Sequence, residues 1–395
     1  MALMGHSRGG EAVATAALFN TLTYYPDDAN IRFDYHYPIK SLVAIAPVDG
    51  QYKPAGEYRF IKDVSYFTIQ GANDSDVSSF SGSRQWDHVQ YPDGGDFFKA
   101  ELYIYGANHG QFNTRWGRSD VGHMLGWFLN QKVLLDPKDQ REIAKVYISA
   151  FLETTLHGNR GYLPMFRDYR VARDWLPKTY YMSRYQDPSY KAVANFNEDP
   201  DLTTTTIPGG HISASNLSIW KEGRIPYRRG DRGYNGVFLG WNRAEKAPVP
   251  AYSLMLPEGF KPPGVLVLSL AVTDQKAPLP GKHEDEDKKK DKDKEDKSAE
   301  VTDFDVELEA GGKTASLPLS RFGALLPPFK VRFTKLQFMD DFAYEKSSEP
   351  AFQTFEIPLS AYANIDPSKL HSVTLKFDRT PMRVIILSQV GFENP

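Results

Sequence analysis

The chain has 395 residues, enough for about two or three domains of ordinary size, and 41% of its residues are hydrophobic, as in globular proteins. Its formal net charge of −3 gives no reason to expect a nucleic acid or an acidic membrane surface as a partner, and no stretch approaches the roughly 18 apolar residues of a membrane span. The chain has no cysteine, which excludes disulfides, thiolate catalysis and cysteine-bound metals and fits an exported bacterial protein.

Residues 1–135 alternate between strand-like and helix-like segments. Residues 2–4 have the character of a strand end, and the alanine-rich run 9–22 predicts a helix. Three further runs are apolar, rich in β-branched and aromatic residues, and bounded by polar, glycine or proline residues: 41–48, 64–71 and 99–106. This pattern is typical of buried parallel strands joined by crossovers, so we expect an α/β domain here.

Residues 136–190 are expected to form a helical extension that bridges two domains. Asp139 and Glu142, three positions apart, predict a capping box at the start of a helix. Apolar residues then recur with the period of a helix, at Ile143, Val146, Tyr147, Ala150 and Phe151. We interpret the aromatic-rich stretch 161–181 as part of this bridge rather than as a substrate site.

Residues 191–395 change to short segments in which apolar and polar residues alternate between turns. The clearest alternations run through Phe304, Val306 and Leu308, through Phe355, Ile357 and Leu359, and through Val373, Leu375 and Phe377. They are typical of an all-β sandwich, and we expect a jelly-roll-like domain. Residues 281–300 have almost no apolar side chains and cannot contribute to a core, so we interpret them as a disordered charged loop.

A candidate nucleophile lies in the first ten residues. A serine hydroxyl reacts at neutral pH only with a base to take its proton, a group to orient that base, and donors for the oxyanion. The pentapeptide Gly5-His6-Ser7-Arg8-Gly9 matches the elbow G-x-S-x-G, in which a tight strand-to-helix turn exposes the serine. An apolar strand end precedes it and a helix-like run follows it, so we predict Ser7 as the nucleophile.

His109 is the candidate base. It comes directly after the apolar run 99–106, at the edge of the sheet where parallel strands present their loops. His88 and His123 are the fallback bases, and surface or packing roles suit them better.

The acid has three candidates. Asp74 follows the run 64–71 in a G-x-x-D turn and is the first choice. Asp76 in the same turn is one alternative. Asp49, after the run 41–48, is the other, because some hydrolases take their acid from that earlier loop. The chain order of serine, acid and histidine matches that of elbow-type hydrolases.

Four motifs carry a resemblance to a known family: GHSRGG (5–10), IAPVDG (45–50), GANDSD (71–76) and GANHG (106–110). In this order they resemble the α/β-hydrolase superfamily and, within it, the polyester hydrolase/cutinase-like and chlorophyllase-like branches. The NDS turn is similar to the acid turn of polyester hydrolases, which favours Asp74. Some chlorophyllase-like relatives place the acid at the end of the strand that follows the nucleophile strand. That strand is the run 41–48 here and the position is Ala46, which again favours Asp74.

The resemblance implies serine ester hydrolysis without a metal or an organic cofactor. Ser7 would attack the acyl carbonyl, His109 would take its proton, and Asp74 would hold the imidazole tautomer. The backbone N–H of Arg8 would donate to the oxyanion. The substrate would be a small-molecule or polymeric ester.

The resemblance also carries an expectation about the start of the chain. Members of this superfamily have about four strands before the nucleophile strand, whereas six residues precede Ser7 here. We therefore expect the chain to be the C-terminal part of a longer protein, and we expect the 395-residue chain by itself to be weakly active and prone to associate.

Residues 350–395 resemble the closing strands of galactose-binding-like jelly rolls, including many carbohydrate-binding modules. This resemblance implies that the sandwich could bind a glycan through exposed aromatic side chains. The candidates are Trp220, Tyr227, Tyr234 and Trp241, with packing in the core as the other explanation for them.

Three functions compete at this point. The first is a serine hydrolase of carboxylic esters with an accessory β-sandwich. The second is an acyltransferase or thioesterase that uses the same triad. The third is a non-catalytic binding module in which the sandwich carries the function.

Overall fold

The computed structural model describes residues 1–121, 126–279, 300–344, 346 and 348–395. The chain divides into two compact units. Unit 1 comprises Met1–Pro188, Tyr227–Arg232 and Phe329–Glu349, and unit 2 comprises Ser189–Pro226, Gly233–Pro328 and Pro350–Pro395. The boundary at Pro188 lies close to the expected one at residue 190, whereas the assignment of the two later segments to unit 1 differs from the expected division.

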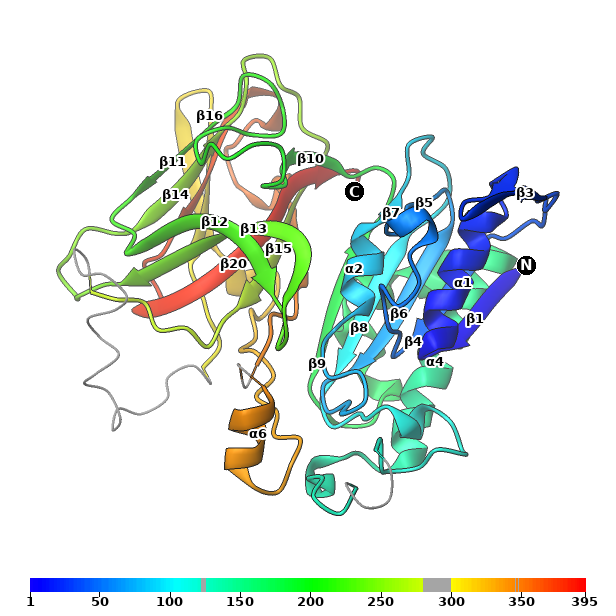
Figure 1. Cartoon of the computed structure of the whole chain (residues 1–395). Coiled ribbons are helices and arrows are strands. Elements are labelled where there is room, and N and C mark those ends of the chain that lie inside the picture. The colour runs from blue at the N-terminus through cyan, green and yellow to red at the C-terminus, as the bar shows by residue number, and fades with distance from the viewer. Residues whose placement is uncertain (122–125, 280–299, 345, 347) are drawn as a thin grey trace. The chain divides into compact units, whose positions relative to one another are not determined.

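Unit 1 is built on a five-stranded sheet with the strand order β1-β4-β6-β8-β9 (Figure 1). Its strands are β1 (Ala2–His6), β4 (Ser41–Ile45), β6 (Ser65–Gly71), β8 (Lys99–Ile104) and β9 (Tyr181–Gln186). The first four are parallel, as expected, and β9 adds antiparallel to β8. The loops that follow the parallel strands therefore meet at one edge of the sheet.

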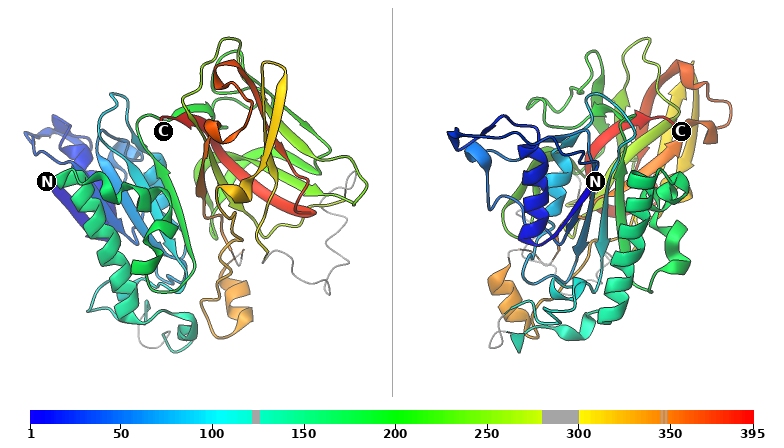
Figure 2. Two further views of the ribbon diagram at one scale, coloured as in Figure 1. Left: turned by 180° about the vertical axis from the view of Figure 1, so that it is seen from behind. Right: turned by 90° about the vertical axis from the view of Figure 1, so that its right-hand side faces the viewer.

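Helices cover both faces of this sheet. Helices α1 (Arg8–Phe19) and α2 (Gly82–Asp87) pack on the face that carries Leu42 and Ala44. Helices α4 (Pro137–His157) and α5 (Leu163–Arg167) pack on the face that carries Val43 and Ile45. Figure 2 shows α1 and α4 on opposite sides of the strands. Adjacent residues of β4 thus point to opposite faces and are buried on both, which explains its continuous apolar run.

Residues 136–188 belong to unit 1, so the expectation that 136–190 form a separate helical bridge between two domains is wrong. Helix α4 buries Ile143, Tyr147 and Phe151 against the sheet of unit 1, so its predicted apolar face is confirmed. Its N-cap is Asp136, whose side chain accepts the Lys138 N–H, and not Asp139 of the expected capping box. The residues after α5 return to the sheet as β9, so this stretch completes unit 1 instead of connecting two domains.

The rest of unit 1 consists of short pairs and one late helix. Strands β2 (Tyr24–Tyr25) and β3 (Asp28–Arg32) pair with each other, as do β5 (Ile61–Lys62) and β7 (Val89–Gln90). Helix α6 (Gln337–Ala343) lies in the segment Phe329–Glu349, where Thr334 forms a β-bridge with Leu129.

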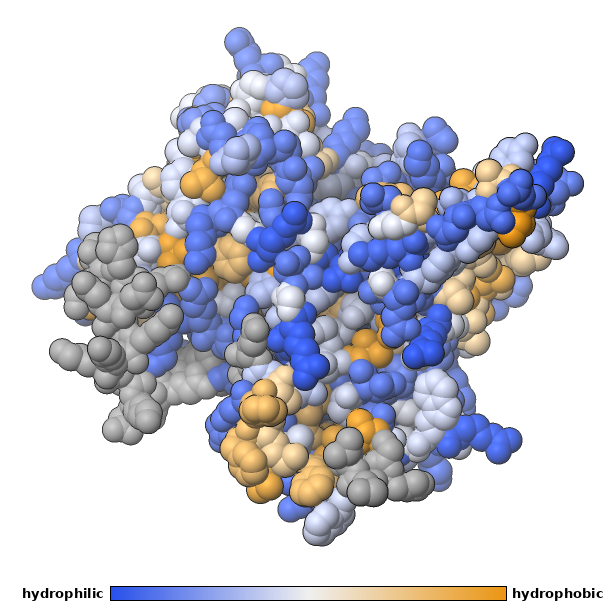
Figure 3. All heavy atoms as spheres, in the orientation of Figure 1, coloured by the Kyte–Doolittle hydropathy of each residue, from blue (hydrophilic) through white to orange (hydrophobic). Residues whose placement is uncertain are grey.

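Helix α6 exposes two phenylalanine side chains. Figure 3 shows apolar side chains over this helix, near the lower edge of the view, where Phe338 is 68% and Phe342 94% exposed. In the part of the chain that the structure describes, no helix combines the length and the apolar character needed to cross a bilayer.

Unit 2 is a β-sandwich. One sheet has the order β12-β13-β20-β15-β18, with β10 also paired to β20, and the other has the order β11-β14-β19-β16-β17. The strands are β10 (Lys191–Ala194), β11 (His211–Ser215), β12 (Ile219–Pro226), β13 (Asp231–Asn242), β14 (Ala251–Met255), β15 (Val265–Val272), β16 (Asp305–Ala310), β17 (Lys313–Pro318), β18 (Gln353–Pro358), β19 (Leu370–Lys376) and β20 (Met382–Glu393). This two-sheet arrangement is consistent with a jelly roll.

A single apolar core fills the space between the two sheets. Leu266 and Leu268 of β15 share it with Val306 and Leu308 of β16, on the other sheet. The alternating residues expected to face inward on β16, β18 and β19 are all buried, so the sandwich prediction is confirmed. The charged loop expected at 281–300 lies between β15 and β16 and, apart from Glu300, outside the described residues.

Candidate active site

Ser7 occupies a strained position between a strand and a helix. Strand β1 ends at His6 and α1 begins at Arg8, and Ser7 between them has φ 60° and ψ −124°. Its N–H donates to Ile45 O at 2.9 Å, and its own carbonyl accepts the N–H of Gly10 at 2.9 Å. A non-glycine residue in such a conformation costs on the order of 1–3 kcal/mol, and such residues concentrate at functional sites. The geometry is that of the tight turn predicted from the elbow motif.

The glycines of the motif have different structural roles. A Cβ added at Gly5 would lie 1.9 Å from the carbonyl oxygen of Gly9, and one added at Gly10 would lie 2.6 Å from Pro47 Cβ. A Cβ added at Gly9 would meet no atom within 4 Å. Close contact of β1 with α1 therefore requires glycine at position 5, and close contact of α1 with the loop after β4 requires glycine at position 10, whereas position 9 is open.

This difference gives a prediction for a matched pair of variants. Gly5→Ala is expected to lower the free energy of unfolding by about 3 kcal/mol or more, because strand and helix must separate. Gly9→Ala is expected to leave it unchanged or raise it by up to about 1 kcal/mol, because alanine favours the helix. Urea unfolding followed by circular dichroism measures both values, and equal values for the two variants would contradict the described packing.

His109 and Asp74 form a buried hydrogen-bonded pair. His109 Nδ1 lies 2.7 Å from Asp74 Oδ2, and both side chains are 3% exposed. The other carboxylate oxygen, Oδ1, accepts the N–H groups of Asp76 at 3.0 Å and Val77 at 2.6 Å. A carboxylate held in this way accepts the Nδ1 proton, which leaves Nε2 as the basic nitrogen of the neutral ring.

Burial and charge act in opposite directions on this pair. Burial raises the pKa of Asp74 to about 6, although the hydrogen bond to His109 lowers it. Burial lowers the pKa of His109, but Asp74, Asp76 and Asp120 together outweigh burial, and the pKa lies above its ordinary value of 6.5. The imidazolium form is therefore stabilised, as a proton-accepting base requires.

The ring of His109 lies beside the residue that precedes Ser7. Ser7 follows His6, whose ring centroid is 4.8 Å from that of His109. His109 Nε2 is buried and has no hydrogen-bond partner among the described residues, so it is not bonded to Ser7 Oγ, and Asp76 Oδ2 lies 3.4 Å from it. Catalytic hydrogen bonds are often long before substrate binds. The structure thus brings Ser7, His109 and Asp74 to the same edge of the sheet.

The indole ring of Trp116 packs against both His6 and His109. Trp116 stacks on His109 with centroids 5.6 Å apart and an angle of 9°, and it lies 4.6 Å from the ring of His6. Burial, followed by the charge of His109, lowers the pKa of His6 to about 4. His6 is therefore neutral near pH 7 and adds no charge beside the base.

The structure places the alternative acid Asp49 away from His109. Its carboxylate forms a buried ion pair with Arg59 and lies 3.5 Å from Arg84. Glu11 of α1 joins the same cluster, 3.1 Å from Arg59, and accepts the N–H of Gly50 at 2.7 Å. Asp49 thus takes part in an ion-pair cluster that connects α1 to the loop after β4.

The fallback base His88 packs away from the Asp74–His109 pair, against two aromatic rings. The ring of His88 packs against Tyr58 and Phe60, with centroids 5.4 and 4.5 Å away. Burial lowers the pKa of His88 to about 4, which suits a packing residue. His123 lies outside the described residues.

The candidate oxyanion donor lies at a helix start. Arg8 is the first residue of α1, and amides of the first helical turn have no acceptor within their own helix. Its N–H is also adjacent to Ser7, as the elbow geometry requires. In the described ranges, no group of three or more His, Asp or Glu side chains is arranged to hold a metal ion.

Several residues that organise these loops were not predicted. Asn73 Oδ1 accepts the Gly106 N–H at 2.8 Å and so joins the acid loop to the start of the histidine loop. Asn108 exchanges backbone hydrogen bonds with the side chain of Gln140 on α4, at 3.1 and 2.7 Å. Asp120 bonds to both loops. The repeated tripeptide Gly-Ala-Asn at 71–73 and 106–108 is the signal that could have indicated the two asparagines.

The four aromatic candidates of the sandwich do not form an exposed platform. Trp241 is fully buried, stacks on Phe377 at 4.2 Å and donates Nε1–H to Thr380 O at 2.6 Å. Tyr227 is buried and belongs to unit 1. Trp220 and Tyr234 are partly exposed. Among the described residues of unit 2, every aromatic side chain is either buried or only partly exposed.

Comparisons with known proteins give no family assignment. No protein-family model and no curated protein matches the chain. Among solved structures, the chain is similar to the family 11 carbohydrate-binding module from Clostridium thermocellum, solved in complex with a beta-1,3-1,4-mixed-linked tetrasaccharide, at 7% identity and a TM-score of 0.27, with 52% of this chain and 96% of that chain covered.

Two further similar structures also match at low identity and low TM-score. The family 30 carbohydrate-binding module of a cellulosomal cellulase of Clostridium thermocellum is 10% identical with a TM-score of 0.24, and the match covers 45% of this chain and 91% of that one. The K1 cleaved adhesin domain of Lys-gingipain from Porphyromonas gingivalis is 11% identical with a TM-score of 0.28, over 52% and 97%. Because these TM-scores are low, the similar structures assign no function to the chain. The description of unit 2 as a β-sandwich is based on its own strand pairing.

Proposed function

We propose that unit 1 is a serine hydrolase of carboxylic esters that works through Ser7, His109 and Asp74. The observation that carries the proposal is the strained turn at Ser7, whose preceding residue His6 has its ring 4.8 Å from His109, a histidine hydrogen-bonded to a buried carboxylate. A strained serine and an oriented imidazole occur together where a nucleophile has to be exposed and deprotonated. The resemblance of the sequence motifs to α/β-hydrolases leads to the same assignment.

The reaction proceeds in two halves. Ser7 Oγ forms a bond to the acyl carbon while its proton passes to His109 Nε2, and the Arg8 N–H stabilises the oxyanion. The ester C–O bond then breaks, and His109 returns the proton to the leaving alcohol. Water then attacks the acyl carbon while its proton passes to His109, the bond from that carbon to Ser7 Oγ breaks, and His109 returns the proton to Ser7 Oγ as the acid leaves. Asp74 keeps the Nδ1 proton in place throughout.

Covalent labelling by a fluorophosphonate tests this proposal directly. The probe is expected to modify Ser7 stoichiometrically, and Ser7→Ala is expected to abolish the labelling. Ser215→Ala is the matched control, since Ser215 is an exposed serine on β11 of unit 2, and it should label like the parent. A folded chain whose Ser7 stays unmodified, as read by mass spectrometry, would contradict the proposal.

A substrate panel separates the enzyme functions that share this triad. Hydrolysis of acyl esters of increasing chain length, with no gain from an added alcohol acceptor, is the expected result. Faster turnover of thioesters, or acyl transfer to the acceptor, would favour the thioesterase or the acyltransferase. Glycan binding by unit 2 stays a prediction, and isothermal titration of soluble β-glucans against the Ser7→Ala variant would test it apart from catalysis.

A further inference from the structure

We propose that Asp120 is a positioning residue that holds the acid loop and the histidine loop in register. The inference rests on the proposed function, because it concerns the Asp74–His109 pair. Asp120 bonds to backbone N–H groups and to the side chains of Ser75 and Asn108, and it is therefore assigned a positioning rather than a catalytic role. Its carboxylate instead lies between the backbones of the two loops that carry the pair.

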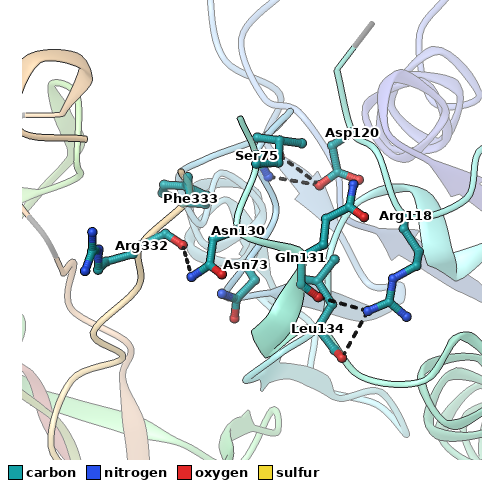
Figure 4. Close-up of a pocket in the computed structure, with 10 residues that line it drawn as sticks. Asn73, Ser75, Arg118, Asp120, Asn130, Gln131, Leu134, Arg332 and Phe333 are labelled. Atoms are coloured by element: carbon teal, nitrogen blue, oxygen red, sulfur yellow. Dashed lines mark hydrogen bonds between the residues drawn. The ribbon is translucent and has the colours of Figure 1, made fainter. Parts of the chain in front are cut away.

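One oxygen of Asp120 contacts both loops. Oδ2 accepts the Ser75 N–H at 3.0 Å and the Ser75 hydroxyl at 3.2 Å, as the dashed lines in Figure 4 show. The same oxygen accepts the backbone N–H of His109 at 3.1 Å. Ser75 directly follows Asp74, so a single atom links the backbones beside the acid and at the base.

The other oxygen extends the contact along the histidine loop. Oδ1 accepts the Gly110 N–H at 2.9 Å and the Asn108 side-chain N–H at 2.7 Å. Asp120 therefore receives five hydrogen bonds, and every partner is a donor. A carboxylate suits this position because it accepts only, whereas an amide would turn its own NH2 group toward some of these donors.

A small cavity lies beside the Asp120 carboxylate. Asp120, Ser75 and Asn73 line a small cavity of about 10 Å³, together with Arg118 and Gln131. Figure 4 shows their polar side chains around this space. The volume is about that needed for one water molecule. The five hydrogen bonds to Asp120 join the two loops beside this space.

Asp120 also acts on His109 through its charge. The charged and titratable groups around that ring are Asp74 at Nδ1, Asp76 near Nε2, Asp120 at its backbone and neutral His6 beside it. Burial lowers the pKa of His109, and Asp120 is one of the three carboxylates that raise it. Neutralising position 120 should therefore lower this pKa.

The test uses two variants of the whole chain. Asp120→Asn removes the charge, and the pKa of His109 measured by NMR titration of the imidazole is expected to fall by roughly half a unit or more. Its kcat for ester hydrolysis is expected to fall about 10- to 100-fold with little change in KM, because the pair is displaced. Asp120→Glu keeps the charge on a longer side chain, so kcat should fall while the pKa of His109 stays near that of the parent.

A control variant separates positioning from general destabilisation. Asp136→Ala removes the N-cap of α4 and is expected to lower stability by about 1 kcal/mol without moving the pKa of His109. If Asp120→Asn does not fold, Asp120→Glu carries the test through kcat. Folded Asp120 variants with the kcat and the His109 pKa of the parent would overturn the inference. If the parent neither labels at Ser7 nor turns over esters, the hydrolase proposal fails, and the His109 titration alone decides the role of Asp120.

Discussion

Replacing Asp74 with asparagine is expected to lower kcat for ester hydrolysis by about 10⁴-fold while the chain stays folded. Asp74 accepts the Nδ1 proton of His109 at 2.7 Å, so this side chain selects the tautomer with a basic Nε2. An asparagine can turn its NH2 group toward Nδ1, and the ring proton then moves to Nε2. His109 would no longer be able to take the proton of Ser7. Steady-state kinetics and circular dichroism of the variant measure both parts of this expectation.

Asp76 provides the matched control for Asp74. Its carboxylate lies 3.4 Å from the other nitrogen of His109, Nε2, and its side chain is 54% exposed. Asp76→Asn removes the charge but keeps the Asp74–His109 bond, so we expect a loss in kcat of no more than about tenfold. Against burial, the charge of Asp76 raises the pKa of His109, so the variant should move the acid limb of kcat/KM to lower pH. Equal losses in the two variants would contradict the assignment of Asp74 as the acid.

The parallel strands of unit 1 could be predicted because strands buried on both faces leave continuous apolar runs in the sequence. β4, β6 and β8 all lie inside the runs expected to be strands. The site residues follow from the same pattern, since Asp74 and His109 each come a few residues after such a strand. Parallel strands place these loops at one edge of the sheet, where side chains far apart in the sequence come together.

Strand β9 could not be predicted in this way. Arg184 lies near its centre, is 1% exposed, and is buried through an ion pair with Asp87 at 3.1 Å. A strand that buries an arginine shows neither an apolar run nor a clean alternation. The buried charge of Arg184 is compensated by Asp87 on α2, and the periodicity of the strand sequence carries no information about that distant partner.

The two later segments of unit 1 were missed for a related reason. Arg228 donates to Ser78 O at 2.6 Å, and its N–H donates to Glu349 at 3.0 Å. Glu349 also accepts the N–H of Phe80. Residues from three distant parts of the sequence thus meet through charge and hydrogen bonding. Asp120 is a similar case, because a single aspartate in a polar loop gives no local sign of the five donors around it.

Replacing Asp87 with asparagine is expected to lower the free energy of unfolding by about 3–5 kcal/mol, a large part of the 5–15 kcal/mol typical of a domain. Asp87 ends α2 and is 7% exposed, with Arg232 Nε at 2.6 Å and Arg184 at 3.1 Å. Lys99, also buried, lies over the ring of Trp86 at 4.0 Å. Without the carboxylate, this group of buried cations loses a counter-charge that water does not replace.

The effect should depend on pH in a defined direction. Burial raises the pKa of Asp87, but Arg232, Arg184 and Lys99 outweigh burial and hold it below its ordinary value. The stabilisation is therefore fully present above the unfolded pKa of about 3.9 and is lost as pH falls below that value. Urea unfolding of the parent and of Asp87→Asn should give free energies that differ most above about pH 5 and converge in more acidic solution.

A double-mutant cycle shows whether the loss comes from the pair with Arg232. Asp87→Asn and Arg232→Gln remove opposite sides of one buried contact, so the double variant should cost less than the sum of the two, by about 1–3 kcal/mol. Asp174→Asn is the surface control, because Asp174 is 86% exposed beside Arg173, and its unfolding midpoint should match that of the parent. Strict additivity in the cycle would contradict the buried pair.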